Sequence, residues 1–398
     1  MTDAIATVRL RPKVDARRLR RGFPWVYANQ LVTDRRTRSL KAGTIARLED
    51  AERYPIGVVA VNPNSKIIAR FLDHDPDIRV DQEWFGHRLR RALHGREAIY
   101  KTPYYRLVHA EADGLPGVVI DRFGSAAVIQ PNAAWADELL EPLVEALAAQ
   151  TGVTAIVKNA QGRARTLEGL DNVSSVLLGY LDGPVAVPMN GATYIADLLG
   201  GQKTGLYYDQ RPNHAFVANL ARGTTVLDVF SHVGGFALAA LAGGADRALS
   251  VDSSEAALKL AVAGAKASKV DDRFETRAVD AFDALETLHE EGRKFGTVVC
   301  DPPAFAPNAK ALDAGLRAYE KVARLSARLV DEGGTLTLCS CSHAADLERF
   351  RSSCVRGIGR AGRRSQIIRT GFAGPDHPQH PDLAESGYLK AMTFRFIG

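Results

Sequence analysis

The chain has 398 residues, of which 46% are hydrophobic and 24% charged, and its formal net charge is +5. This length and apolar content allow large buried cores, favour two or three domains and argue against disorder. The first ten residues lack the apolar stretch of a signal peptide, and no run reaches the roughly 18 apolar residues of a membrane span. We therefore expect a cytoplasmic protein without a membrane partner.

The positive charge is concentrated near the amino terminus. Residues 1–50 contain 12 Lys or Arg against 5 Asp or Glu. Four arginines lie between Arg17 and Arg21, and the aromatic residues Phe23, Trp25 and Tyr27 follow them. Guanidinium groups bind phosphates and aromatic rings stack on unpaired bases, so this pattern indicates binding of single-stranded nucleic acid. We expect RNA as the partner and no DNA. A solvated basic surface is the alternative interpretation.

The first half of the chain predicts two small domains. Short β-rich runs broken by turn residues indicate a β-barrel module over residues 1–75. A mixed α+β middle domain is expected over 76–197. Its predicted elements are helices at 81–99 and 134–149, strands at 117–121, 126–130 and 153–158, and a hairpin of 184–188 with 192–196 around Asn190-Gly191.

Residues 198–398 predict an α/β domain, because strands and helices alternate regularly from about Thr224. The expected strands are 224–230, 247–252, 273–278, 296–301, 334–340, 365–370 and 389–397. No helix separates the last two, which suggests that the sheet ends in an antiparallel edge strand. Ligands of such sheets bind beyond the carboxyl ends of the strands.

The run from Thr225 to Phe236 ends a strand and opens a glycine-rich helix. The dinucleotide fingerprint G-x-G-x-x-G is absent, because Phe230 and His232 occupy the positions of its first two glycines. Pyrophosphate binding is therefore disfavoured.

Three acids mark the ends of the first three strands of this domain. Asp252 is suited to hold both ribose hydroxyls, and Asp280 to read an adenine edge. Together with Asp228 they fit a cationic nucleoside such as S-adenosylmethionine, although any one of them could instead cap a helix. The neighbouring residues expected in the same cofactor site are Phe230, Ser231, Gly234, Ser253 and Ala281.

Two further strand ends bring an acid, a rigid Pro-Pro and a thiol to the same crevice. They are Cys300-Asp301-Pro302-Pro303-Ala304-Phe305 and Leu338-Cys339-Ser340-Cys341-Ser342. This combination favours chemistry on a flat nucleobase. The four cysteines fit neither a disulfide framework nor zinc-ligand spacing.

These motifs, with the stretch 201–211 and the loop 374–390, resemble the RlmI-type large-subunit (23S) rRNA cytosine-C5 methyltransferases over essentially the whole chain. The resemblance implies a PUA-like RNA-binding domain, a middle domain and a Rossmann-like class I methyltransferase domain. It also implies S-adenosylmethionine as cofactor, S-adenosylhomocysteine as product and large-subunit rRNA as partner. The residues that it adds to the cofactor site are Lys203, Thr204, Tyr208, Arg211, Asp301 and Pro302.

In C5 methylation a thiolate adds to C6 of cytosine and makes C5 nucleophilic. Related enzymes with two cysteines carry one directly after the proline of the acid-proline motif, where this chain has Pro303 and Ala304. A single nucleophile is therefore expected. We predict Cys341, because it lies nearer the crevice than Cys339, and Asp301 as acceptor for the exocyclic amine. The base that removes the C5 proton is not assigned.

Other functions fit parts of the pattern. Asp-Pro-Pro-Ala-Phe also resembles the motif of base-nitrogen methyltransferases, which need no nucleophilic cysteine. An inactive RNA-binding protein is a second alternative, disfavoured by the intact acids. A nicotinamide oxidoreductase is a third, disfavoured by the missing glycines. The oligomeric state stays open, with a homodimer as one alternative.

Overall fold

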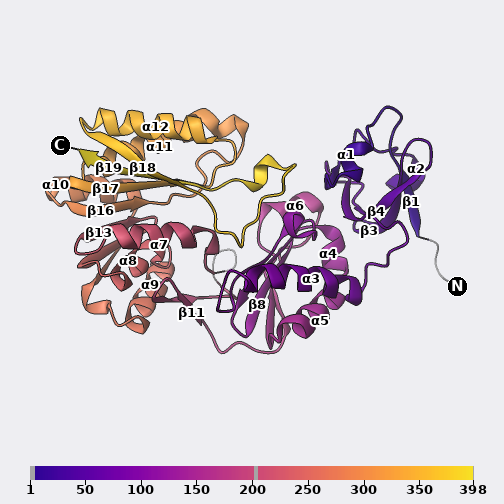
Figure 1. Ribbon diagram of the computed structural model, residues 1–398, viewed down its shortest axis with the longest axis horizontal. Coiled ribbons are helices and arrows are strands. Elements are labelled where there is room, and N and C mark those ends of the chain that lie inside the picture. The colour runs from indigo at the N-terminus through magenta and orange to yellow at the C-terminus, as the bar shows by residue number, and fades with distance from the viewer. Residues whose placement is uncertain (1–4, 201–204, 398) are drawn as a thin grey trace. The chain divides into compact units, whose positions relative to one another are not determined.

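The computed structural model describes residues 5–200 and 205–397. Backbone contacts divide these residues into two compact units (Figure 1). The first comprises 5–182 with 378–382, and the second comprises 183–200, 205–377 and 383–397. Within the described ranges, no helix is long and apolar enough to cross a bilayer.

The first unit begins with a small five-stranded sheet of order β1-β3-β4-β5-β2. β1 pairs in parallel with β3, and the other pairs are antiparallel. The elements are β1 (Ala6–Arg9), α1 (Arg17–Arg20), β2 (Trp25–Val26), α2 (Arg35–Arg38), β3 (Thr44–Glu49), β4 (Pro55–Val61) and β5 (Ala69–Asp73). Branched side chains such as Val8, Leu48 and Val59 fill its interior, as the alternating pattern predicts.

A second sheet of order β10-β9-β8-β7-β6 completes the first unit. Its elements are α3 (Gln82–Glu97), β6 (Tyr104–His109), β7 (Val118–Phe123), β8 (Ala126–Pro131), α4 (Ala134–Glu138), α5 (Leu140–Thr151), β9 (Ala155–Lys158), α6 (Arg163–Glu168) and β10 (Ser175–Leu178). The single helix expected at 134–149 is broken at Leu139. Pro142 explains the break, because it has no N–H for the carbonyl of Glu138 and its ring would clash with that carbonyl.

Buried polar contacts join the two sheets of the first unit. Glu168 accepts hydrogen bonds from Asn62, Ser65 and Arg70 at 2.9–3.0 Å. Trp25 donates through Nε1 to Glu111 at 2.9 Å. A buried carboxylate that keeps several partners is satisfied only in one arrangement, so these contacts fix the small sheet against its neighbour.

The second unit is built on a seven-stranded sheet of order β15-β14-β13-β16-β17-β19-β18. Its strands are β13 (Thr225–Val229), β14 (Arg247–Asp252), β15 (Phe274–Ala278), β16 (Phe295–Cys300), β17 (Val330–Ser340), β18 (Arg364–Gly371) and β19 (Lys390–Ile397). Its helices are α7 (Arg211–Leu220), α8 (Gly235–Ala242), α9 (Glu255–Ala267), α10 (Ala281–Glu290), α11 (Leu312–Ala327) and α12 (Leu347–Arg360).

The predicted Rossmann-like sheet is confirmed, with one correction. β19 is antiparallel to both neighbours, as expected for the last strand, but it lies between β17 and β18. The edge strand is therefore β18. The sequence pattern could not distinguish the two orders, because both strands follow one another without an intervening helix.

The hairpin of β11 (Val185–Met189) and β12 (Ala192–Ala196) forms as predicted, with left-handed φ values of 53° at Asn190 and 79° at Gly191. It packs on α9, where the Thr193 N–H donates to Ser268 Oγ at 2.8 Å. The hairpin therefore belongs to the second unit, and the chain divides before it, near Gly183, and not after it at residue 197.

Candidate active site at the carboxyl ends of the central strands

Three residues of the loop after β13 have positive φ values, a conformation typical of glycine, although two of them are not glycine. Phe230 has φ 61°, His232 has φ 48° and Gly234 has φ 80°. Phe230 and His232 are the positions where the dinucleotide fingerprint would carry glycine. Side chains in this left-handed region cost roughly 1–3 kcal/mol each and persist where the surroundings impose them, often at functional sites. Asp252 supports the loop, because its Oδ2 accepts from the His232 N–H at 2.8 Å.

Asp228 is completely buried at the base of this loop. Its Oδ2 accepts from the Ala237 N–H at 2.9 Å, whereas Oδ1 has no hydrogen-bond partner among the described residues. Ser231 Oγ is likewise buried without one. Burial raises the pKa of Asp228 to about 7. A buried carboxylate oxygen and a hydroxyl left unsatisfied in this way are expected where a ligand completes the site.

Asp228 and Ser231 both line a pocket between the β13 loop and the segment that leads into α7. The pocket is lined by Leu206, Tyr207, Gln210, His214, Asp228, Phe230, Ser231, His232, Val233, Gly235, Phe236 and Asp301. Burial lowers the pKa of His214 to about 3, so its imidazole is neutral. A Cβ on Gly235 would lie 2.9 Å from that ring, so only glycine leaves this space open. The predicted residues Asp228, Phe230, Ser231 and Asp301 are thus brought together.

Tyr207 is a pocket residue that the sequence analysis missed. Burial, with a contribution from Asp209 and Asp301, raises the pKa of its phenol to about 12. Tyr207 is therefore a neutral hydrogen-bonding group beside the crevice. We expected Tyr208 in the cofactor site, but Tyr207 lines this pocket instead. The Tyr208 side chain is 1% exposed and lies under the guanidinium of Arg211.

The other predicted cofactor residues flank this pocket. Asp280 is exposed and caps α10, accepting from the Phe282 and Asp283 N–H groups. Helix capping, the alternative stated for each acid, is therefore present at this one. Ala281, the first residue of α10, is buried, and Ser253, which follows β14, is exposed. Lys203 and Thr204 lie outside the described residues.

The four cysteines differ sharply in exposure. Cys341 is partly exposed, directly after β17, whereas Cys300, Cys339 and Cys354 are at most 1% exposed. Cys339 packs in a small apolar cluster that includes Phe236. Burial raises the pKa values of these three thiols, so they remain protonated and inert. The predicted preference for Cys341 over Cys339 agrees with this difference in depth.

A frame of hydroxyl groups holds the chain on either side of Cys341. The Tyr319 hydroxyl lies 2.9 Å from Ser340 Oγ and 2.7 Å from Ser342 Oγ. Ser342 Oγ also accepts from the Ala306 N–H at 3.0 Å. Since Ala306 follows the Asp-Pro-Pro-Ala-Phe stretch, this contact joins the two motifs. Pro302 is buried, and Phe305 stacks on Phe282 with ring centroids 6.3 Å apart.

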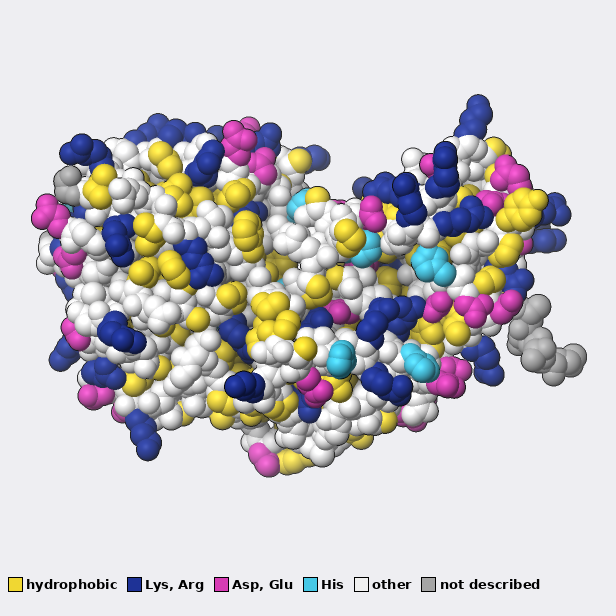
Figure 2. Space-filling model, in the orientation of Figure 1, with side chains coloured by type: hydrophobic (Ala, Val, Ile, Leu, Met, Phe, Trp, Pro, Cys, Tyr) yellow, Lys and Arg dark blue, Asp and Glu magenta, His cyan; other side chains and the backbone are white. Residues whose placement is uncertain are grey.

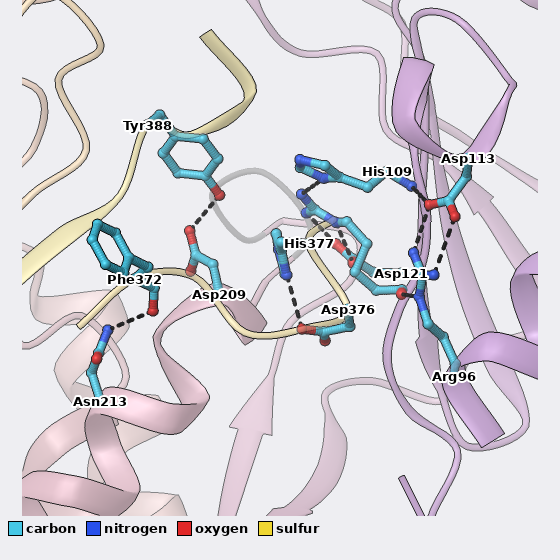
Figure 3. A network of polar contacts seen from close by, with 11 residues as sticks. Arg96, His109, Asp113, Asp121, Asp209, Asn213, Phe372, Asp376, His377 and Tyr388 are labelled. Atoms are coloured by element: carbon cyan, nitrogen blue, oxygen red, sulfur yellow. Dashed lines mark hydrogen bonds and ion pairs between the residues drawn. The ribbon is translucent and has the colours of Figure 1, made fainter. Parts of the chain in front are cut away.

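The segment between β18 and β19 is tied to the entrance of α7 (Figure 3). The Tyr388 hydroxyl donates to Asp209 Oδ2 at 2.6 Å, and Asn213 Nδ2 donates to the Phe372 carbonyl at 3.2 Å. His377 and Asp376 are paired at 3.0 Å within this segment. The segment 372–388, which includes most of the loop that contributes to the family resemblance, is therefore fixed at both ends.

The amino-terminal arginines differ from the predicted pattern. Arg18 stacks on Phe23, Arg20 pairs with Asp50 at 2.9 Å, and Phe23 itself is 4% exposed. Phe23 is therefore a core residue and not a platform for bases. Basic side chains nevertheless gather over the region of α1 (Figure 2).

Comparisons with known proteins agree with this architecture. Residues 8–74 match the model of a PUA-like domain, and residues 90–395 match that of an S-adenosylmethionine-dependent methyltransferase. Ribosomal RNA large subunit methyltransferase I of Shewanella denitrificans is 32% identical over 98% of both chains. The protein of that name from Shewanella amazonensis is 34% identical over 95% of this chain and 96% of its own.

The chain belongs to the ribosomal RNA large subunit methyltransferase I family. Solved structures confirm the fold of this family member. A Streptococcus mutans protein assigned as a SAM-dependent methyltransferase superposes with a TM-score of 0.80 at 20% identity, covering 98% of this chain and all of its own. A methyltransferase solved with S-adenosylhomocysteine also has a TM-score of 0.80, at 21% identity over 98% of this chain and 99% of its own.

Proposed function

We propose that this family member transfers a methyl group from S-adenosylmethionine to C5 of a cytosine in large-subunit ribosomal RNA. Membership of the family supports the reaction class and the RNA substrate. The observation that carries the C5 chemistry is the position of Cys341. Among the four cysteines it alone is partly exposed, and it lies at the carboxyl end of β17, where ligands of such sheets bind.

The residues of the β13 pocket fit the cofactor. Asp228 Oδ1 and Ser231 Oγ are buried polar atoms that lack partners among the described residues, and they suit the ammonium and hydroxyl groups of such a ligand. Asp252, at the next strand end, would accept the ribose hydroxyls. Bound S-adenosylmethionine supplies an electrophilic methyl group and leaves as S-adenosylhomocysteine. We also retain Asp280, Lys203 and Thr204 as proposed cofactor residues.

In the proposed mechanism, Cys341 loses its proton and its sulfur forms a bond to C6 of the cytosine. The electron pair of the C5–C6 double bond makes C5 nucleophilic, and C5 forms the bond to the transferred methyl group. A base then removes the C5 proton, the C–H pair restores the double bond, and the sulfur–C6 bond breaks to return the thiolate. Asp301 would accept a hydrogen bond from the exocyclic amine and hold the ring.

We propose that the first unit contributes RNA affinity through the α1 surface, in the cytoplasm where ribosomal RNA is processed. Arg17, Arg18, Arg20 and Arg21 are all exposed, although Arg17 also pairs with Asp15 and Arg20 with Asp50. Replacing the four arginines with alanine should weaken RNA binding and reduce its salt slope by roughly 0.7 per lost phosphate contact. An unchanged slope would make this surface an ordinary solvated one.

Mass spectrometry of nucleosides, after incubation of ribosomal RNA with enzyme and labelled cofactor, tests the reaction. We expect labelled 5-methylcytosine from the wild type and from Cys339→Ala, and none from Cys341→Ala. RNA containing 5-fluorocytosine, which cannot lose a proton at C5, should form a covalent adduct that Cys341→Ala fails to form.

The Cys339 variant is the matched control, because both substitutions remove one thiol from the same strand end. Labelled N-methylated bases with full activity in Cys341→Ala would refute C5 methylation and support the base-nitrogen alternative, which the Asp-Pro-Pro-Ala-Phe motif also permits. Loss of activity in Cys339→Ala alone would keep the chemistry and reverse the assignment.

A further inference from the structure

A buried lysine holds the main chain that follows Cys341. The ammonium of Lys390 donates to the Ser342 carbonyl at 2.7 Å and to the Ala345 carbonyl at 2.8 Å. Lys390 is 5% exposed. An ammonium group is costly to bury, and these two carbonyls carry no formal charge with which to neutralise it. The two carbonyls therefore hold the Lys390 amine at the turn that follows Cys341, the one cysteine that is partly exposed.

The strand order accounts for this placement. β19 lies directly beside β17, and Lys390 pairs with Ser340, the residue before Cys341. Had β19 been at the edge of the sheet, β18 would have separated Lys390 from this strand end. The lysine and the cysteine are 49 positions apart in sequence, yet the register brings them to the same end of two neighbouring strands.

The charges around the strand end are mixed. Cys341 and Asp346 both favour the protonated form of Lys390, although burial lowers its pKa. Among the described residues, the phenols of Tyr207 and Tyr319 also interact electrostatically with Cys341, and their pKa values are raised by burial. Phenols with raised pKa values are neutral at pH 7. Lys390 is therefore a cation that the acidic groups Cys341 and Asp346 favour at this strand end.

We propose that Lys390 is a positioning residue for the nucleophile: it holds the turn after Cys341 through two carbonyls, and its positive charge stabilises the Cys341 thiolate. This inference rests on the proposed role of Cys341. Thiolate formation precedes addition to C6, so a larger thiolate fraction at neutral pH increases the rate of that step. The hydroxyl groups of Ser340, Tyr319 and Ser342 then fix the main chain around Cys341 but contribute no charge to stabilise its thiolate.

Alkylation of Cys341 by iodoacetamide as a function of pH, followed by mass spectrometry of its peptide in the full-length protein, tests the charge directly. In the wild type we expect the midpoint below about 8.5, the ordinary value for cysteine. Lys390→Met should raise the midpoint by about one unit or more, because loss of a neighbouring opposite charge raises the pKa of a thiol by about that amount. Lys390→Arg should restore part of the shift.

Tyr319→Phe is the matched control, because it breaks the frame on the other side of Cys341 and removes no charge. Its midpoint should stay within a few tenths of a unit of the wild type. Equal shifts in both variants would assign the effect to geometry and overturn the inference. A wild-type midpoint at or above about 8.5 would overturn it without any variant, so the test survives if Lys390→Met fails to fold.

Methyl transfer separates this inference from the proposed function. In Lys390→Met we expect kcat to fall about tenfold at neutral pH and to recover at high pH, with cofactor affinity unchanged. If Cys341→Ala abolishes methylation and Lys390→Met leaves the alkylation midpoint unchanged, only the role of Lys390 fails. If the midpoint shifts and Cys341→Ala remains active, the proposed function fails and Lys390 still tunes the thiol.

Discussion

The ends of β13 and β17 lie in one sheet, but they differ in whether the buried polar groups around them are hydrogen-bonded. At β13, buried polar atoms of Asp228 and Ser231 lack partners among the described residues. At β17, Ser340, Ser342 and Tyr319 satisfy one another around Cys341. A binding site must leave polar groups for its ligand to complete, whereas a nucleophile must be held before the substrate arrives. The buried polar atoms at the β13 end therefore need the cofactor to complete their hydrogen bonds, whereas those at the β17 end do not.

Asp252→Ala should produce the largest change at the β13 end. Loss of the carboxylate removes the acceptor for the ribose hydroxyls and for the His232 N–H. We expect cofactor affinity to fall by about 1 to 3 kcal/mol, measured by calorimetry. Asp246→Asn, an exposed acid at the opposite ends of the strands, is the control. Unchanged affinity would remove Asp252 from the site.

At the β17 end, Tyr319→Phe should change the stability of the protein and not its cofactor affinity. Removing the hydroxyl leaves Ser340 and Ser342 without this partner, so the free energy of unfolding should fall by about 1 to 3 kcal/mol. Cofactor affinity should not change. Chemical denaturation and calorimetry on the same samples give both quantities, and a loss of affinity without a loss of stability would contradict the contrast.

The raised pKa of Asp228 predicts pH-dependent cofactor binding. A cationic ligand favours the ionised carboxylate, and the free protein must release the proton of a group with a pKa of about 7. Affinity should therefore be about tenfold higher at pH 8 than at pH 6, the ratio of ionised fractions. His214, with a pKa of about 3, does not titrate in this range. In Asp228→Asn the tenfold difference should vanish; its persistence would point to another group.

Ser231→Ala should give the smallest effect and complete the comparison. Its hydroxyl has no partner among the described residues, so removing it should leave the stability of the ligand-free protein unchanged or slightly higher. Cofactor affinity should fall by about 0.5 to 1.5 kcal/mol, the contribution of one hydrogen bond. A clear loss of stability in the ligand-free protein would show that Ser231 has a structural role.

Much of the second unit was predictable because regular strand and helix alternation permits few arrangements. The strands lie within a few residues of their expected positions, and Cys341 could be preferred from depth alone. The place of β19 was not predictable, since strand order depends on long-range pairing. Neither was the role of Tyr207, which follows a stretch without periodicity. The break at Leu139 was foreseeable from Pro142.

The amino-terminal cluster shows the converse. Composition there indicated arginines and stacking aromatic rings, but Phe23 is buried under Arg18 and Arg20 is paired with Asp50. Local composition cannot show which side chains are buried in a small core or paired within it. Predictions from strand-end motifs were more accurate, because the ends of parallel strands meet at one edge of the sheet and a residue there must lie at that edge.

The internal position of β19 has a consequence for how this protein can be shortened or edited. Deleting residues 390–397 would remove a strand paired on both sides and leave β18 without its neighbour. β17 would become an open edge, with main-chain groups available to pair with other chains. A one-residue slip of β19 would be almost as harmful, because it would turn every side chain of the strand to the opposite face and move Lys390 off Ser340. Changes to the last strand are therefore expected to alter both the solubility of the protein and the reactivity of its thiol.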